Sequence, residues 1–254
     1  MMRVCCLQHI SCEPPGVFED VLRERGAEIV RVELDEGDRL PDWRSADLVV
    51  VMGGPMSVND EEDHGWLPDE KTWIAEAVHA GVPFFGVCLG AQLLAASLGA
   101  TVRRGEVPEV GVLPIELTDA ARSDPVFSVL QPGVRVLQWH GDTFELPPGA
   151  VHLGRSARYE HQAFRYGAWA YAVQFHLEVT EAMFEEWSDV PAYRASLDQT
   201  IGGNGVEILA KQFTEARDEM TTAARRLFTR FCDHAVFDAG QPNPTLSPRP
   251  DQEE

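Results

Sequence analysis

A short apolar run, Phe84 to Val87, passes through Gly-x-Cys-x-Gly directly into a segment with helical character. Such a turn holds its central residue, Cys88, in a strained backbone conformation, and the flanking glycines let other backbone segments pass closely. A helix N-terminus at this point favours a thiolate and leaves the N–H of Leu89 free. The turn therefore predicts a nucleophile elbow that carries a cysteine above a sheet. The alternative is that Cys88 is a small buried residue before an ordinary helix.

Strands and helices alternate through the first hundred residues. Apolar runs at 4–9, 28–34, 47–52 and 82–87 are separated by helical patterns at 15–25, 66–80 and 90–98. This order predicts an α/β fold with a mostly parallel central sheet flanked by helices. After Gly99, apolar runs are separated by Pro, Gly and Asp, and they predict an additional antiparallel region with a tight hairpin at 166–168. These runs lie at 110–117, 134–138, 150–154, 162–166 and 170–175.

The C-terminal part of the chain has a different pattern. Apolar residues recur at helical spacing over about 205–235, which predicts one long amphipathic helix, and we expect it on the edge of the sheet. Residues 237–254 are rich in proline and acidic residues and have few large apolar side chains, so we expect a disordered tail. We find no linker in residues 1–236, and we expect them to form one domain.

A thiol nucleophile needs a base and an orienting acid, which are often remote in sequence. A strand that ends at His176 brings its imidazole to the same sheet edge as Cys88, and Glu178 has the spacing to hold one ring nitrogen. A histidine at a strand end is by itself more often structural, but here it accompanies a cysteine elbow. The pair Gly53-Gly54 follows another strand and exposes backbone N–H groups that can stabilise an oxyanion.

The composition limits the partners. The chain has 21 basic and 41 acidic residues, a net charge of −20, and such a surface repels nucleic acids and anionic membranes. It has neither the roughly 18-residue apolar run of a membrane span nor a signal-peptide pattern. Its five cysteines have no disulfide spacing, which favours free thiols in the cytoplasm. Because adjacent Cys5 and Cys6 face opposite sides of a strand and no Cys-x-x-Cys follows, we expect no metal site and no cofactor.

Over roughly residues 4–187, the chain resembles the class I (triad) glutamine amidotransferases, most of all the stand-alone GMP synthase-like subgroup. The segments that carry this resemblance are Met52-Gly-Gly-Pro-Met-Ser-Val58, Gly86 to Gln92, Gln138-Trp-His-Gly-Asp-Thr-Phe144, Gln162-Ala-Phe-Arg-Tyr166 and Val173-Gln-Phe-His-Leu-Glu-Val179. The resemblance implies a flavodoxin-like class I amidotransferase fold. One position departs from the family pattern: Leu177 stands where the family usually has proline, which leaves the orientation of Glu178 open.

The resemblance also implies roles for individual residues. The family's triad falls on Cys88, His176 and Glu178, and its oxyanion hole on the backbone N–H groups of Gly54 and Leu89. The expected substrate contacts are Gly53, Gln92, His140 and Asp142. The last two belong to a segment, 139–142, that resembles a loop beside the amino-acid end of the substrate in relatives; the alternative is a loop that only closes the pocket.

These assignments imply a glutaminase that forms a γ-glutamyl thioester on Cys88. The sequence has no Ser-Gly-Gly-x-Asp-Ser loop and no Walker sequence, so we expect ammonia to pass to a separate synthetase subunit or other acceptor. The substrate is then a small molecule, glutamine or another γ-glutamyl compound. Two alternatives stay open: a γ-glutamyl hydrolase or peptidase with the same triad, and a catalytically silent binding or regulatory protein on the same scaffold.

Overall fold

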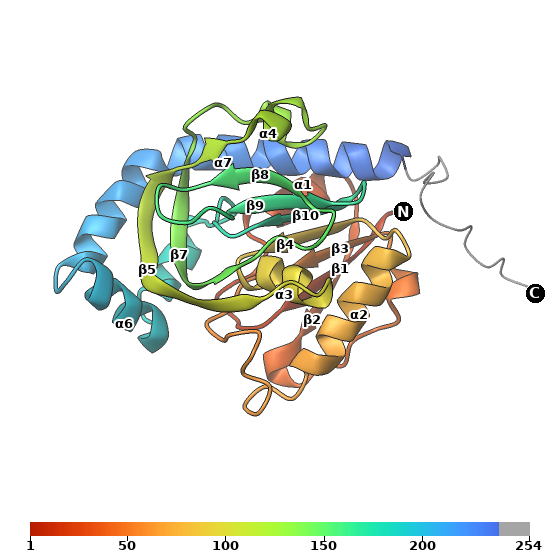
Figure 1. The fold of residues 1–254 in the computed structure, drawn as a ribbon, viewed down its shortest axis with the longest axis horizontal. Helices are drawn as coiled ribbons and strands as arrows, with labels where there is room; N and C mark the ends of the chain where they lie inside the picture. The colour runs from red at the N-terminus through yellow and green to blue at the C-terminus, as the bar shows by residue number, and fades with distance from the viewer. Residues whose placement is uncertain (239–254) are drawn as a thin grey trace, which may run out of the picture.

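The structure, a computed structural model, describes residues 1–238 of the chain. Its centre is an eight-stranded sheet in the order β2-β1-β3-β4-β10-β9-β8-β6, and β5 and β7 form a separate two-stranded sheet (Figure 1). The strands are β1 (Arg3–Gln8), β2 (Glu28–Glu33), β3 (Leu48–Val51), β4 (Phe84–Val87), β5 (Val102–Pro114), β6 (Glu116–Leu117), β7 (Arg135–Phe144), β8 (Val151–Arg155), β9 (Ala163–Tyr166) and β10 (Ala170–Val173).

The helices connect and cover these strands. They are α1 (Val17–Glu24), α2 (Leu67–His79), α3 (Leu89–Ser97), α4 (Asp119–Ser123), α5 (Glu181–Trp187), α6 (Pro191–Thr200) and α7 (Gly205–Asp238), with short 3₁₀ turns at Leu34–Glu36, Trp43–Ser45 and Phe127–Val129. The sequence pattern did not reveal α5 and α6. From residue 239 onward, the tail expected at 237–254 lies outside the described residues.

The large sheet has a parallel half and an antiparallel half. Strands β2, β1, β3, β4 and β10 pair in parallel, whereas β9 pairs antiparallel with β10 and β8, and β8 antiparallel with β6. The hairpin expected at 166–168 joins β9 to β10, with Gly167 at a positive φ of 60°. This arrangement confirms the expected α/β class, and it shows that β10 belongs to both halves.

Strand β5 differs from its prediction. It begins at Val102, eight residues before the expected start, and pairs antiparallel with β7, with an irregularity between Arg104 and Glu109. The added residues are mostly polar, so no apolar alternation marks them as a strand. The segment 139–142, expected as a loop, lies within β7, where Trp139 and His140 pair with residues of β5.

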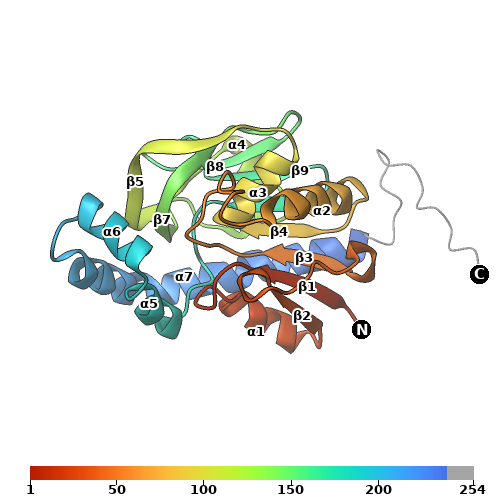
Figure 2. The same cartoon turned by 90° about the horizontal axis from the view of Figure 1, so that it is seen from below.

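Helices cover both faces of the large sheet (Figure 2). Helices α2 and α3 pack on one side, and α1 and α7 pack against each other on the opposite side. The expectation that the long helix lies on the sheet edge is wrong. Phe228 of α7 stacks on Phe18 of α1 at 4.4 Å, and Phe231 lies 5.0 Å from Phe85 of β4, between ring centroids. Because β4 is in the middle of the sheet, its apolar face needs a cover there, and α7 provides it.

Candidate active site

Cys88 lies in the turn between β4 and α3 with φ 51° and ψ −104°, and within residues 1–238 it is the only residue other than glycine with a positive φ. A side chain at Gly86 would collide with the backbone of Gly90, and one at Gly90 would collide with the backbone of Val51. These two contacts explain why the turn needs glycine on both sides of Cys88. The N–H of Cys88 donates to the carbonyl of Val173 at 2.8 Å and so fixes the turn to β10.

His176 follows β10 and is not, as expected, its last residue, since the strand ends at Val173. Its backbone exchanges two hydrogen bonds with Leu137 of β7, at 2.8 and 3.0 Å. Its Nδ1 lies 2.7 Å from Oε1 of Glu178, and both side chains are buried. The ring is thereby oriented with Nε2 free for another partner, and Cys88 is close enough for each of the two side chains to shift the pKa of the other.

Leu177 contributes to this arrangement through its backbone. Its N–H donates to Oε2 of Glu178 at 3.0 Å, so both oxygens of the buried carboxylate have a partner. A proline, which lacks an N–H, cannot make this contact. The structure therefore defines the orientation of Glu178 despite the missing proline: one carboxylate oxygen contacts His176 and the other accepts the N–H of Leu177.

The charges of the site make the imidazole of His176 a strong proton acceptor. Burial works to lower the pKa of His176, but the Glu178 carboxylate and, after it, Cys88 outweigh this effect, and the pKa of His176 is raised well above its usual value. Burial raises the pKa of the Cys88 thiol, against the opposing effect of His176. A buried thiol of this kind needs an adjacent base to lose its proton, and His176 is in position to take it.

Two backbone N–H groups lie near the thiol without an acceptor. Neither the N–H of Gly54 nor that of Leu89 has a hydrogen-bond partner in the described part of the chain. The two residues are neighbours, since a Cβ placed on Gly54 would lie 3.1 Å from the Leu89 side chain. Gly54 and Cys88 line the same cavity, so an oxygen atom bound there can meet unpaired donors.

That cavity has a volume of about 370 Å³. Among the expected substrate contacts, Gln92, His140 and Asp142 line it, whereas Gly53 does not. A side chain at Gly53 would collide with the carboxylate of Glu13. One wall comes from α6, which the sequence reasoning missed; it contributes Ala192, Tyr193, Ala195, Ser196 and Gln199.

The lining side chains are held by other polar groups. Gln92 donates to Oε1 of Gln174 at 3.1 Å, and Nε2 of Gln174 lies 3.5 Å from the sulfur of Cys88. Asp142 accepts a hydrogen bond from Ser57 at 2.7 Å. Hydrogen bonds therefore connect the side chains of the cavity wall on this side.

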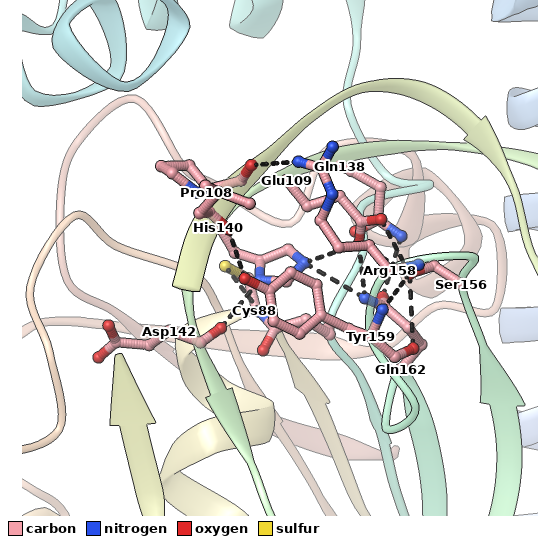
Figure 3. Close-up of polar contacts among 12 residues, drawn as sticks. Cys88, Pro108, Glu109, Gln138, His140, Asp142, Ser156, Arg158, Tyr159 and Gln162 are labelled. Carbon is pink, nitrogen blue, oxygen red and sulfur yellow. Dashed lines mark hydrogen bonds and ion pairs between the residues drawn. The ribbon is translucent and has the colours of Figure 1, made fainter. Parts of the chain in front are cut away.

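Behind His140 lies a buried polar cluster that joins β5, β7 and the segment before β9 (Figure 3). Glu109 accepts hydrogen bonds from Ser156 at 2.8 Å and from Gln162 at 2.9 Å, and it lies 3.3 Å from Nε2 of His140. Nδ1 of His140 faces the carbonyl of Asp142 at 2.8 Å. These contacts orient the His140 ring at the cavity wall.

Two further acidic residues near the site were not anticipated. Glu13 is buried, accepts a hydrogen bond from the hydroxyl of Tyr193 and has no partner for its Oε2. Burial raises the pKa of Glu13, against the opposing effects of His176 and Tyr193. Glu70 is buried against His9 at 2.8 Å. A signal was present for His9 and Glu13, since both lie in the segment between the end of β1 and the start of α1, at the same sheet edge as Cys88.

Within residues 1–238, no helix is long and apolar enough to cross a membrane, and no group of three or more His, Cys, Asp or Glu side chains is arranged to hold a metal ion. Cys5, Cys6, Cys12 and Cys232 are free and buried, like Cys88. Burial raises the pKa of Cys232 to about 12, and no histidine contributes to that shift. Among these thiols, Cys88 is the one that a histidine side chain contacts.

The fold and the site define an α/β protein that presents a cysteine, a histidine and a carboxylate at one edge of a mostly parallel sheet. The family model described as "Glutamine amidotransferase class-I" matches residues 17–186, more than half of the chain. The chain therefore belongs to the class I glutamine amidotransferase family.

Individual relatives agree with this assignment. The chain is 33% identical to the glutamine amidotransferase-like protein YfeJ of Salmonella typhimurium, over 70% of this chain and 77% of that protein. It is 32% identical to one subunit of the glutamine-hydrolysing GMP synthase of Sulfolobus acidocaldarius, over 62% of this chain and 80% of that protein. The crystal structure of a glutamine amidotransferase from Thermotoga maritima superposes with a TM-score of 0.80 at 32% identity, over 91% of this chain and 97% of that one.

Proposed function

We propose that the protein hydrolyses the side-chain amide of glutamine through a γ-glutamyl thioester on Cys88. The observation that carries this proposal is the contact of Cys88 with a histidine that a buried carboxylate orients, next to the unpaired N–H groups of Gly54 and Leu89. This combination supplies a nucleophile and an oxyanion site at the cavity that Cys88 and Gly54 line, with a buried base next to the nucleophile.

In the first half of the reaction, the sulfur of Cys88 attacks the amide carbon of glutamine while His176 accepts the thiol proton. The carbonyl oxygen becomes an oxyanion, to which the N–H groups of Gly54 and Leu89 donate. His176 then gives its proton to the amide nitrogen as the carbon–nitrogen bond breaks. Ammonia leaves, and the γ-glutamyl group remains on the sulfur.

In the second half, His176 accepts a proton from water, and the resulting hydroxide attacks the thioester carbon. The same N–H groups hold the second oxyanion, which collapses to glutamate as the carbon–sulfur bond breaks, and His176 returns its proton to the leaving sulfur. Glu178 stabilises the imidazolium in both halves, because it contacts Nδ1 at 2.7 Å.

The fate of the ammonia is part of the proposal. Two relatives bear the name of a single subunit of a glutamine-hydrolysing GMP synthase, which supports transfer of the ammonia here to a separate synthetase subunit. We include in this proposal the cytoplasmic location expected from the sequence.

The test compares wild type, Cys88→Ala and Cys232→Ala on glutamine, γ-glutamyl dipeptides and γ-glutamyl amines, with and without candidate synthetase subunits. We expect glutamine to be preferred, Cys88→Ala to be inactive, and Cys232→Ala to match wild type. A diazo-ketone analogue of glutamine should label Cys88 alone. Equal activity of the two variants would refute the nucleophile assignment.

The same panel separates the alternatives. A preference of more than about tenfold in kcat/KM for γ-glutamyl peptides, or roughly 1.4 kcal/mol, without any partner effect would make the protein a hydrolase. Absence of turnover and of thioester formation with every substrate would support a silent binding or regulatory protein.

A further inference from the structure

A second buried histidine–glutamate pair contacts the Gly53–Gly54 segment of the candidate site. Nε2 of His9, directly after β1, lies 2.8 Å from Oε1 of Glu70 in the first turn of α2. Nδ1 of His9 lies 3.2 Å from the carbonyl oxygen of Gly53. The side chains of His9 and Glu70 are fully buried.

The two contacts of the ring define its protonation. A carboxylate and a peptide carbonyl are both hydrogen-bond acceptors, so each ring nitrogen needs a proton to satisfy its partner. The groups that face His9 are Glu70 from α2, Glu13 from the segment after β1, and the Gly53 carbonyl. Burial works to lower the pKa of His9, but Glu70 outweighs it and the pKa is raised. The geometry and the charges both favour an imidazolium.

The carbonyl that His9 contacts belongs to the peptide bond whose nitrogen is that of Gly54. A Cβ placed on Gly54 would lie 3.1 Å from the Cβ of His9, so the histidine packs directly under this residue. A hydrogen bond from a cation to a peptide oxygen draws electron density from the N–H of the same peptide group and strengthens its donation. The chain of contacts thus runs from Glu70 through His9 to a donor that faces the cavity.

We propose that Glu70 and His9 position and polarise the Gly53–Gly54 peptide, so that the N–H of Gly54 binds the oxyanion more strongly than an ordinary amide does. The inference rests on the reaction proposed above and assigns positioning roles to two residues outside the expected triad. The effect belongs to the transition state, because the negative charge on oxygen exists only there. Loss of the cation therefore lowers kcat and leaves KM nearly unchanged.

The first experiment does not depend on activity. Nitrogen NMR shifts of the imidazole rings should show His9 of the wild type with both nitrogens protonated at pH 7. In Glu70→Gln, the His9 ring should become neutral at that pH, and the amide proton of Gly54 should move upfield. A neutral His9 ring in the wild type would overturn the inference.

The second experiment measures steady-state release of p-nitroaniline from γ-glutamyl p-nitroanilide. Removal of an oxyanion donor typically costs about 10²–10³-fold in kcat, and a weakened donor should cost less, so we expect about a tenfold loss in Glu70→Gln with KM within about twofold of wild type. His9→Asn, which keeps a neutral donor, should retain more activity than His9→Leu. Glu76→Gln is the matched control on the same helix, since Glu76 contacts Trp43 away from the cavity, and it should match wild type.

The outcomes separate this inference from the reaction on which it rests. Full kcat in Glu70→Gln, with turnover that still depends on Cys88, would overturn only the role of the His9–Glu70 pair. A wild type without turnover, or turnover retained in Cys88→Ala, would overturn the proposed function as well. A parallel rise in KM or a loss of native fold that accounts for the lower rate would assign His9 and Glu70 a structural role alone.

Discussion

The two buried histidine–glutamate pairs of the candidate site have nearly the same internal distance and differ in what the second ring nitrogen contacts. Nδ1 of His176 lies 2.7 Å from Glu178, and Nε2 of His9 lies 2.8 Å from Glu70, with all four side chains buried. The remaining nitrogen of His176 is free for the thiol, whereas that of His9 contacts a peptide carbonyl. The same chemical unit is thus suited to exchange a proton in one place and to hold a fixed charge in the other.

The pairs also differ in the sequence separation of their two members. His176 and Glu178 are two residues apart, and the N–H of Leu177 between them holds the carboxylate. His9 and Glu70 are separated by 61 residues, and they meet only because α2 packs beside the end of β1. Removal of one member of a buried pair typically costs about 3–5 kcal/mol, so variants that keep the shape are the sharper probes of both pairs.

The largest expected effect falls on the pair that contacts the thiol. In the proposed reaction, His176 moves the proton in both halves, so we expect kcat of His176→Ala to fall by at least about 10³-fold, since general acid–base catalysis typically contributes about 10²–10⁴-fold. Steady-state hydrolysis of glutamine measures it, with the exposed His79→Ala as control. If His176→Ala lowers kcat no more than Glu70→Gln does, the two pairs do not have the different roles proposed for them.

The next effect concerns pH. Loss of the carboxylate in Glu178→Gln lowers the pKa of His176, because a nearby negative charge stabilises the imidazolium. The acidic limb of kcat/KM should therefore move to lower pH, while kcat falls by about 10²-fold because the imidazolium loses its partner. A pH profile of both enzymes measures the shift. If the acidic limb of kcat/KM does not move in Glu178→Gln, a group other than His176 is responsible for it.

A smaller effect isolates the N–H of Leu177. In Leu177→Pro, Glu178 loses a hydrogen bond to a charged group, which is typically worth about 1.5–3 kcal/mol, and we expect the free energy of unfolding of Leu177→Pro to lie below that of Leu177→Ala by about that amount, with less than a tenfold loss of kcat. Leu177→Ala keeps the N–H and loses the buried side chain, so it is the matched control for denaturant titrations. Equal free energies of unfolding for the two variants would show that the N–H of Leu177 does not stabilise the His176–Glu178 pair.

The smallest effect tests Glu13, which lies near both pairs and carries a raised pKa because it is buried. A carboxyl with a raised pKa in the folded state stabilises the protein at acidic pH, and this contribution is lost as the pH rises through that pKa. Glu13→Gln has no such loss. The Tm of the variant relative to wild type should therefore be higher at pH 8 than at pH 5, by about 2 °C or more. A pH-independent difference would contradict the burial of an ionisable Glu13.

The sequence by itself determined the features that depend on neighbouring residues. The glycines beside Cys88 are required by backbone atoms of the turn and of Val51, so their spacing indicated the elbow directly. The spacing of His176 and Glu178 likewise indicated an interacting pair. The alternation of apolar runs and helical patterns predicted the α/β class, because each pattern reflects the local period of its own element.

Only the tertiary structure decided what lies opposite these residues. The contacts of His9 with Glu70 and of Glu13 with Tyr193 join positions 61 and 180 residues apart, and α6 supplies a cavity wall that no local pattern marks. Segment 139–142 became strand rather than loop because β5 pairs with it, and α7 covers the middle of the sheet rather than its edge because β4 needs an apolar partner there. Each of these outcomes depends on packing between elements that are remote in sequence. The pattern of a single stretch of residues cannot predict it, because the partners lie elsewhere in the chain.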